Sequence, residues 1–149
     1  LFNSMILPVL SYGCEVWTMR ENEKQKLQTT QRAMERRTLG IKLIQKIAST
    51  TIRKHTKFKD AYIDALQRKF RWAGHVARRE DNRWTNRTTF WWPYNFRRPR
   101  GQPADRWRKL MQNKLGNNWQ ELARNRTAYK EQTAEALSSM SNFDRKQSY

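Results

Sequence analysis

Apolar residues recur at helical spacing most clearly in residues 60–84, DAYIDALQRKFRWAGHVARREDNRW. The recurring positions are Tyr62, Leu66, Phe70, Ala73, Val76 and Ala77. Apolar residues three or four positions apart share one face of a helix, and that face packs against a core. The pattern therefore predicts a helix that ends near Arg79, followed by a polar turn.

Weaker patterns predict two helices before this segment. Residues 21–39 are predicted to form a half-exposed helix, capped by Asn22 at its start and by Gly40 at its end. Residues 49–54 are predicted to form a short helix that turns Ile52 inward.

The N-terminal segment, residues 1–17, is dense in apolar side chains. Pro8 and Gly13 interrupt it, so we expect the end of a helix followed by a bent, extended piece. Apolar packing is the expected role of this segment, and part of its surface would be exposed without a neighbouring domain. Because the chain begins with Leu1 inside this apolar segment, we expect it to be a fragment of a longer protein.

Three further helices are predicted toward the C-terminus. Pro103 is expected to open the first, since the first turn of a helix does not use that N–H group, and Gly116 is expected to stop it. Residues 119–123 predict a short helix, and residues 129–140 predict a last one.

These elements combine into a mainly α fold, a small bundle of about five to six helices with a long basic aromatic loop. The helical region is expected at residues 1–79, the loop at 80–103, the C-terminal helices at 104–140 and a disordered tail at 141–149. Prolines exclude a continuous helix from the loop, which is predicted to contain only a short β-like piece at residues 88–92.

The net charge of the chain indicates the class of molecule that it binds. Lys and Arg total 31 against 13 Asp and Glu, so the 149-residue chain has a net charge of +18. Self-repulsion of this size is relieved most naturally by a polyanion such as RNA or DNA. The mean hydropathy of −1.07 predicts a thin core, and the many aromatic residues supply much of its apolar area.

Cysteine usage and hydropathy indicate the compartment. Cys14 is the single cysteine, which excludes an internal disulfide and suits a reducing compartment. The longest apolar run, residues 5–10, contains Pro8 and is far too short to cross a membrane. We therefore expect a protein that is not secreted and has no membrane partner.

Catalytic and metal-binding residues are not expected in this chain. Cys14, His55 and His75 are too far apart in the sequence to form a zinc site. No pair of aspartates flanked by apolar strand residues is present to hold Mg²⁺ for nucleotidyl transfer. A helix cap and a surface ion pair explain Asp60 and Asp64, so no cofactor is expected here.

Basic and aromatic residues are interleaved along residues 66–109. Lys and Arg neutralise phosphates, while flat side chains offer faces to unpaired bases. The candidate nucleic-acid-binding residues are Arg68, Lys69, Arg71, Trp72, His75, Arg78, Arg79, Arg83, Trp84, Arg97, Arg98, Arg100, Arg106 and Trp107. For a single tryptophan, burial is the more common role. A basic cluster also fits a nuclear-localisation signal or an acidic membrane patch, but for the charge as a whole nucleic acid is favoured.

Five motifs follow one another along the chain. They are ILPVLSYGCEVWT at residues 6–18, QRAMERRTLGI at 31–41, RKFRWAGHVAR at 68–78, DNRWT at 81–85 and RGQPADRW at 100–107. In order and spacing they resemble the C-terminal region of non-LTR retrotransposon reverse transcriptases of the RTE and Bov-B type. Two departures are Gln102, where relatives often have Arg, and the unusually aromatic stretch TTFWWPYNF at residues 88–96.

The resemblance implies a parent endonuclease–reverse transcriptase that copies element RNA at a nicked chromosomal target. Its polymerase aspartates and Mg²⁺ would lie in an upstream palm, and residues 1–79 of this chain would lie near the thumb. The implied partners are RNA template, primer–template duplex or target DNA, together with the upstream polymerase domain of the same polypeptide. The implied location is a nuclear or cytoplasmic ribonucleoprotein. No catalytic residue of the family falls in this sequence.

Three hypotheses remain open at this point. In the first, the chain is a non-catalytic nucleic-acid-binding fragment of a reverse transcriptase that contacts backbone more than base sequence. In the second, it is a docking module in which the apolar N-terminal segment completes the core of the polymerase domain. In the third, it is a decayed relic of an element without function.

Overall fold

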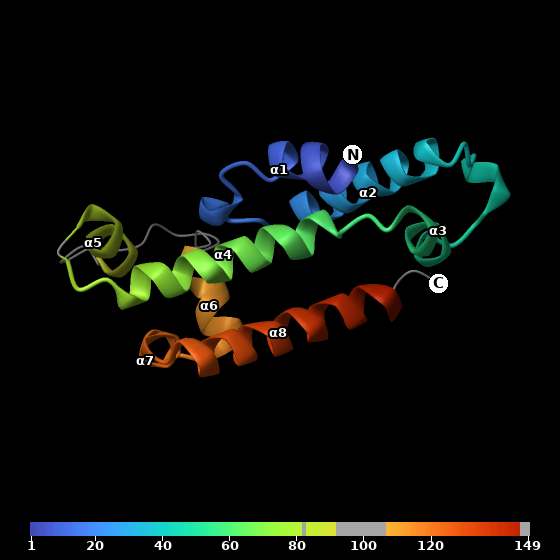
Figure 1. Ribbon diagram of the computed structural model, residues 1–149. Coiled ribbons are helices and arrows are strands. Elements are labelled where there is room, and N and C mark those ends of the chain that lie inside the picture. Colours follow the sequence, from blue (N-terminus) through green and yellow to red (C-terminus); the bar gives the residue numbers. More distant parts are fainter. Residues whose placement is uncertain (82, 92–106, 147–149) are drawn as a thin grey trace, which may run out of the picture.

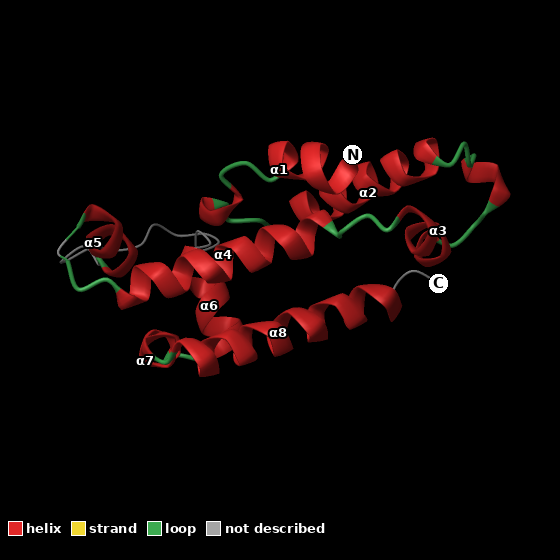
Figure 2. Cartoon of the chain, in the orientation of Figure 1, coloured by secondary structure: helices red, strands yellow, loops and turns green. Residues whose placement is uncertain are grey.

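The computed structural model describes residues 1–81, 83–91 and 107–146, and it describes side chains up to residue 140. In these ranges the chain forms eight α-helices, three short helices of other types and no strand (Figure 2). The mainly α fold is therefore confirmed. The expected count of five to six helices was too small, because short helices also form in the N-terminal segment and inside the predicted loop.

The helices succeed one another with short connections. In chain order they are η1 (Phe2–Ile6), α1 (Leu7–Leu10), η2 (Cys14–Val16), α2 (Glu21–Thr38), η3 (Leu43–Gln45), α3 (Ser49–Thr56), α4 (Ala61–Arg78), α5 (Trp84–Phe90), α6 (Trp107–Leu115), α7 (Trp119–Arg124) and α8 (Arg126–Lys146). Figure 1 shows α4 running through the middle, with α1 and α2 on one side and α8 on the other. Because η2, α2, α5, α7 and α8 all contact α4, this helix is the element on which the rest is assembled.

α4 has the apolar face that its sequence predicted. Leu66, Phe70, Ala73 and Val76 are all buried. Apolar side chains of this size each contribute roughly 1.5–3 kcal/mol when fully buried, apart from the smaller alanine. The period of the sequence therefore sets which side of α4 faces inward.

The two carboxylates at the start of α4 have the roles expected of them. Asp60 precedes the helix, and its Oδ1 accepts hydrogen bonds from the backbone N–H groups of Tyr62 and Ile63, at 3.0 and 3.1 Å. Side-chain caps of this kind stabilise a helix by about 1 kcal/mol. Asp64 forms an ion pair with Arg68, one turn later, at 2.8 Å.

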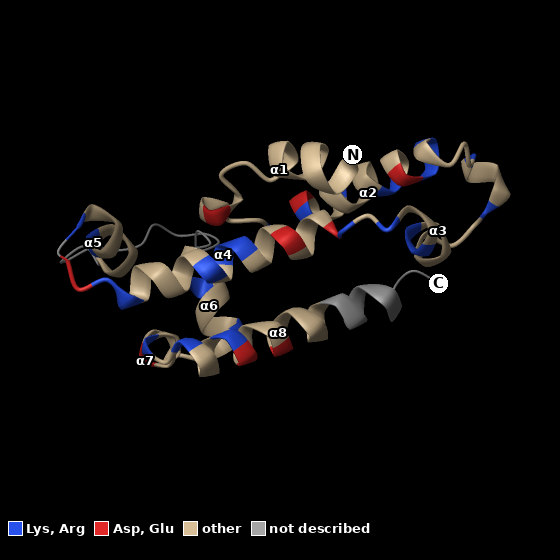
Figure 3. Ribbon diagram, in the orientation of Figure 1, with Lys and Arg blue, Asp and Glu red and all other residues tan. Residues whose placement is uncertain are grey.

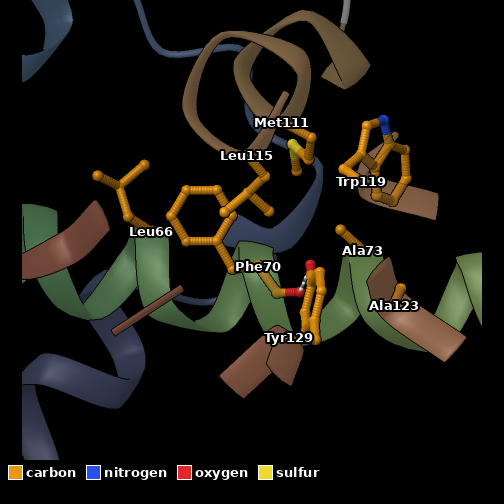
Figure 4. Close-up of a cluster of buried hydrophobic side chains, with 8 residues drawn as sticks. All are labelled: Leu66, Phe70, Ala73, Met111, Leu115, Trp119, Ala123 and Tyr129. Atoms are coloured by element: carbon orange, nitrogen blue, oxygen red, sulfur yellow. Dashed lines mark hydrogen bonds between the residues drawn. The ribbon is translucent and has the colours of Figure 1, made fainter. Parts of the chain in front are cut away.

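One end of α4 meets the C-terminal helices in an apolar core (Figure 4). This C-terminal core consists of Leu66, Phe70, Ala73, Met111, Leu115, Trp119, Ala123 and Tyr129. Trp119 is completely buried. Tyr129 donates its hydroxyl proton to the carbonyl of Phe70 at 2.7 Å, so the polar tip of this side chain is satisfied inside the core.

A glycine lets Tyr129 approach α4 closely. A Cβ atom on Gly74 would lie 2.8 Å from Cε1 of the Tyr129 ring, which is closer than such atoms pack. Gly74 is therefore explained by the close contact between α4 and α8, although glycine costs a helix about 1 kcal/mol relative to alanine.

The N-terminal end of α4 packs against a smaller apolar cluster. Its buried members are Phe2, Leu7 and Ala61. The rings of Phe2 and Phe58 stack with their centroids 4.0 Å apart. This cluster holds η1 and α1 against the start of α4.

Residues 1–17 do not contain the extended piece that was expected. They form η1 and α1 and then, after a turn, η2. Pro8 does not end a helix here, because it lies in the first turn of α1, where the absent N–H group breaks no helical hydrogen bond.

Four polar side chains join α2 and α3 to the start of α4. This polar network consists of Gln31, Glu35, Arg53 and Asp60. Arg53 donates from Nε to Glu35 Oε1 at 2.9 Å and from Nη1 to Asp60 Oδ2 at 2.6 Å. Gln31 donates to the carbonyl of Lys59 and accepts from the N–H of Ala61, both at 2.8 Å. Gln31 and Glu35 are buried, so α2 packs on α4 through hydrogen-bonded side chains.

The predicted loop begins with a helix. α5 occupies Trp84–Phe90, where a loop and a β-like piece were expected. The prolines that argued against a helix come only after residue 92, so they do not interrupt this stretch. Thr88 and Thr89 also donate their hydroxyl protons to carbonyls one turn earlier, at 2.8 and 2.7 Å.

Two other boundaries differ from the prediction. α8 continues to Lys146, beyond the boundary expected at residue 140, because neither glycine nor proline occurs within it. Asn22 does not cap α2; Arg20 occupies the cap position, and Glu23 accepts a hydrogen bond from its backbone N–H. The helix opening predicted at Pro103 lies outside the described residues.

Gly40 follows the end of α2 and Gly116 follows α6, as predicted. Both adopt positive φ angles, +66° and +86°. This left-handed conformation is the usual way in which a glycine ends a helix.

Candidate nucleic-acid interface

Three of the candidate residues form an exposed stripe along α4 and its C-cap residue, Arg79. Arg71, His75 and Arg79 are four positions apart and all three are exposed. Residues four apart lie above one another on a helix, about 6 Å apart along its axis. We call these three residues the α4 stripe. Figure 3 shows Lys and Arg recurring along this helix, in which Asp64 is the one acidic residue.

Lys69 does not belong to this surface. Its side chain is buried, with 5% exposed, and its ammonium donates a hydrogen bond to the carbonyl of Trp17. The ammonium also lies 6.0 Å from the centroid of the Trp107 ring. Burial lowers the pKa of Lys69 to about 8, a shift that the nearby Cys14 thiol partly opposes. Lys69 is therefore a packing residue and is not placed to meet a phosphate.

Two candidate arginines on α4 already have partners in the chain. Arg68 is half-buried and paired with Asp64. Arg78 is also half-buried, and its Nη1 donates to the carbonyl of Ala123 in α7 at 3.0 Å. Arg78 therefore ties the end of α4 to the C-terminal core.

The start of α5 presents charge and an exposed indole. Arg83 is exposed and forms an ion pair with Asp81 at 2.5 Å. Trp84 is 75% exposed, and the guanidinium of Arg87 lies 5.5 Å from the centroid of its ring. Surface pairs of this kind are worth little energetically and exchange readily for other partners.

Trp72 and Trp107 are half-buried and line an open groove of about 520 Å³. We call it the α4–α5 groove. Its lining residues are Val16, Trp72, Val76, Thr85, Thr88, Thr89, Trp91, Trp107 and Arg108. The side chains come from η2, from α4, from α5 and its C-cap, and from the start of α6, so four separate elements build this hollow.

The remaining candidates, Arg97, Arg98, Arg100 and Arg106, lie outside the described residues. The structure thus brings together the α4 stripe, the exposed start of α5 and the α4–α5 groove. Lys69 is buried and is not part of this exposed surface.

Several groove residues were not among the candidates from sequence. Val16 comes from the apolar N-terminal segment, where nothing in the pattern marks it as part of a site. Thr85, Thr88 and Thr89 became neighbours of Trp72 only because the segment expected as a loop is helical. Trp91 and Arg108 had a usable signal, since both lie in the basic aromatic region.

Residues 1–81, 83–91 and 107–146 contain no group of three or more His, Cys, Asp or Glu side chains that could hold a metal ion. No helix within them is both long enough and apolar enough to cross a membrane.

The N-terminal helices expose much apolar surface, as the sequence led us to expect. Leu1, Val9 and Tyr12 are 93%, 78% and 86% exposed, and Met5 and Val16 are also exposed. An apolar area of this kind commonly marks an interaction site.

Comparison with known proteins identifies a relative. The chain is 40% identical over 111 residues to an uncharacterized transposon-derived protein of Caenorhabditis elegans, a match that covers 72% of this chain and 40% of the relative. The chain therefore spans less than half the length of that protein. No protein-family profile matches the chain, and no solved structure matches it. The similarity supports an origin of this chain in a transposable element.

Proposed function

We propose that this chain is a non-catalytic, nucleic-acid-binding part of a retrotransposon reverse transcriptase that holds RNA template, primer–template duplex or target DNA. The observation that carries the proposal is the α4 stripe, an exposed row of side chains on the central helix of a chain with net charge +18. The similarity to a transposon-derived protein supports the setting. The five motifs in order support the assignment to the RTE and Bov-B type.

The proposed contact is with the sugar–phosphate backbone. Arg71 and Arg79 lie two turns apart, about 12 Å along the axis of α4, so they can meet separate phosphates. The opposite face of the helix is buried in the core, which fixes the row in place. No base-reading motif accompanies the charge, so binding should extend across sequences.

Catalysis belongs, in this proposal, to the polymerase domain of the parent protein. Mg²⁺ for nucleotidyl transfer needs clustered oxygen ligands, chiefly carboxylates. The described residues offer no acidic cluster of that kind, so no catalytic step is assigned to this chain.

Binding across a salt series tests the proposal. For six to eight phosphate contacts on duplex, the logarithm of the binding constant should fall with the logarithm of salt concentration at a slope of about −5 to −7. The probes are single-stranded RNA, RNA–DNA hybrid and double-stranded DNA of equal length, followed by fluorescence anisotropy. A response that does not change with salt would refute phosphate binding.

A charge-matched pair of variants locates the contact. Arg71→Ala with Arg79→Ala removes two exposed charges from the α4 stripe and should reduce the salt slope by about 2. Lys26→Ala with Arg37→Ala removes two exposed charges from α2 and should change the slope much less. Equal effects of the two pairs would mean that overall charge, and not this stripe, governs binding.

The exposed apolar surface of η1 and α1 favours a second function, docking onto another domain of the parent polypeptide. Sedimentation of the chain alone and with the polymerase domain of the parent tests it. Docking requires a one-to-one complex between the two; two independently sedimenting species would refute it.

A further inference from the structure

The α4–α5 groove has walls that are held in place by contacts outside it. The Phe90 ring lies 6.1 Å from that of the buried Trp119, which fixes the end of α5 on the C-terminal core. Asn86 donates a hydrogen bond to the carbonyl of Arg79 at 2.8 Å, which joins α5 to the end of α4. The groove is therefore a built hollow between anchored elements.

The wall contributed by α6 is fixed in the same way. Trp107 donates its indole N–H to the carbonyl of Glu15 at 2.5 Å. Because this bond already uses the indole N–H of Trp107, only the face of its ring is available to a ligand. Val16 follows Glu15 directly and lines the groove beside it.

The chemistry of the lining suits a flat, apolar-faced ligand. Trp72, Trp91 and Trp107 supply aromatic surface, and Arg108 supplies a positive charge. The hydroxyl donors of Thr88 and Thr89 are already used on carbonyls within α5. The described lining thus favours stacking over the recognition of a particular base edge.

The charge that would accompany such a ligand lies next to the groove. Trp72 and Val76 each follow a member of the α4 stripe by one position, about 100° around the helix. A backbone on Arg71, His75 and Arg79 would therefore run along the rim, with its bases directed toward Trp72 and Trp91.

We infer that the α4–α5 groove accepts an unpaired nucleobase, and that the chain therefore prefers single-stranded nucleic acid to blunt duplex. A paired and stacked base cannot enter, because its faces are covered by its neighbours. The inference rests on the proposed function, which supplies the phosphate contacts. It specifies that function further, because the tryptophans of the groove would select unpaired bases.

Two exposed tryptophans at opposite ends of α5 give a matched test. Trp91 is 64% exposed and lines the groove, whereas Trp84 is 75% exposed and does not. Both side chains are accessible enough that alanine should leave the fold intact, which circular dichroism would verify. The probes are ten-nucleotide oligouridine and oligothymidine and a blunt ten-base-pair DNA duplex.

Trp91→Ala should weaken oligonucleotide binding by roughly 5- to 150-fold, the range for losing one base–aromatic stack. Duplex binding should change by less than about twofold. Trp91→Phe should restore much of the loss because it keeps an aromatic face. Trp84→Ala should leave the ratio of oligonucleotide affinity to duplex affinity nearly unchanged, because Trp84 does not line the groove. The two oligonucleotides distinguish RNA from DNA as the source of the base.

A second measurement needs no variant. A single 2-aminopurine in the oligonucleotide should lose fluorescence when it stacks against an indole in the wild-type chain. An equal loss of the single-strand preference in Trp91→Ala and Trp84→Ala, or no quenching of a bound strand, would overturn the groove assignment and leave phosphate binding standing. No binding to any of the three probes at low salt would overturn the proposed function itself, and the groove assignment with it.

Discussion

The two ends of α4 are held to their neighbours by different kinds of interaction. At its C-terminal end, α4 meets α6, α7 and α8 through an apolar core around Phe70 and Trp119. At its N-terminal end, α4 meets α2 and α3 through the polar network, in which Glu35 is fully buried. One helix thus joins a region stabilised mainly by apolar packing to a region stabilised mainly by side-chain hydrogen bonds.

The two ends of α4 should therefore tolerate amino-acid substitutions differently. Apolar cores accept substitutions that conserve volume, because the interaction is not directional. A buried polar network depends on every member at once, since a partner left alone is a desolvated polar group or charge. Glu35 already has one oxygen, Oε2, that is buried without a hydrogen-bond partner in the described part of the chain. Substitutions that remove a polar group should therefore destabilise the N-terminal end of α4 most. Substitutions that change side-chain volume should destabilise the C-terminal end most.

Removing Trp119 should have the largest effect. Trp119→Ala deletes a fully buried indole and should cost about 3–5 kcal/mol. That is a large part of the stability of a domain of this size. Urea unfolding followed by circular dichroism measures it. Trp119→Phe, which keeps most of the aromatic surface, should cost much less, and an equal loss for the two variants would contradict a volume-based core.

The buried ammonium of Lys69 should make stability rise in mild alkali. Its pKa is about 8 in the folded chain and 10.5 when unperturbed. Below pH 8 both states hold the proton and folding bears the cost of burying the charge. Between these two values Lys69 holds more protons in the unfolded chain, so its titration raises stability with pH, by about 3 kcal/mol at most. The Cys14 thiol opposes part of this rise, because burial raises its pKa and the folded chain then retains that proton longer.

Urea unfolding at several values between pH 7 and 10 measures this rise, and Lys69→Met should abolish it. Above pH 10 the trend should reverse, because burial raises the pKa of Tyr129 to about 12 and the folded chain then retains the proton longer. Tyr129→Phe is the control for that second phase. A rise that survives in Lys69→Met would assign the effect to other groups.

Breaking the polar network should lower the free energy of unfolding by less, and the single and double variants should differ in a characteristic way. Arg53→Met leaves Glu35 buried without its cation and should cost about 2 kcal/mol, reduced from the range for fully buried pairs because Arg53 is partly exposed. Adding Glu35→Met removes the stranded carboxylate, so the double variant should be more stable than Arg53→Met alone. Additive losses in this double-mutant cycle would show that the two side chains do not act as a pair.

The apolar end was largely predictable from sequence, and the polar end was not. The spacing of Leu66, Phe70 and Ala73 identified the buried face of α4 because burial of apolar residues is a property of each residue and its period. Glu35 gives no such signal, since a polar residue on a helix usually faces water, and Gln31 lies on only a weak stripe with Leu27 and Met34. Their burial depends on Arg53 and Asp60, partners that only the fold brings near.

The residues of the candidate site also divide into those that were predictable from the sequence and those that were not. Arg71, His75 and Arg79 were predictable as exposed, because they lie off the apolar period of α4. Lys69 was wrongly grouped with them, since its acceptor is the carbonyl of Trp17, 52 positions earlier in the chain. Gly74 had no visible reason until Tyr129, from the last helix, was found against it.

The hydrogen bond from Trp107 to the carbonyl of Glu15 joins residues 92 positions apart. Contacts between residues so distant in sequence carry a loop-closure entropy cost, which the rest of the fold must offset. The hollow beside Trp107 is therefore a property of the closed chain and of no single helix. Any ligand that occupies it draws on both halves of the sequence, so its binding energy adds to the stability of the whole fold. Deleting the chain up to and including Val16 would remove not only a lining side chain but also the anchor that orients the Trp107 indole, 92 positions away.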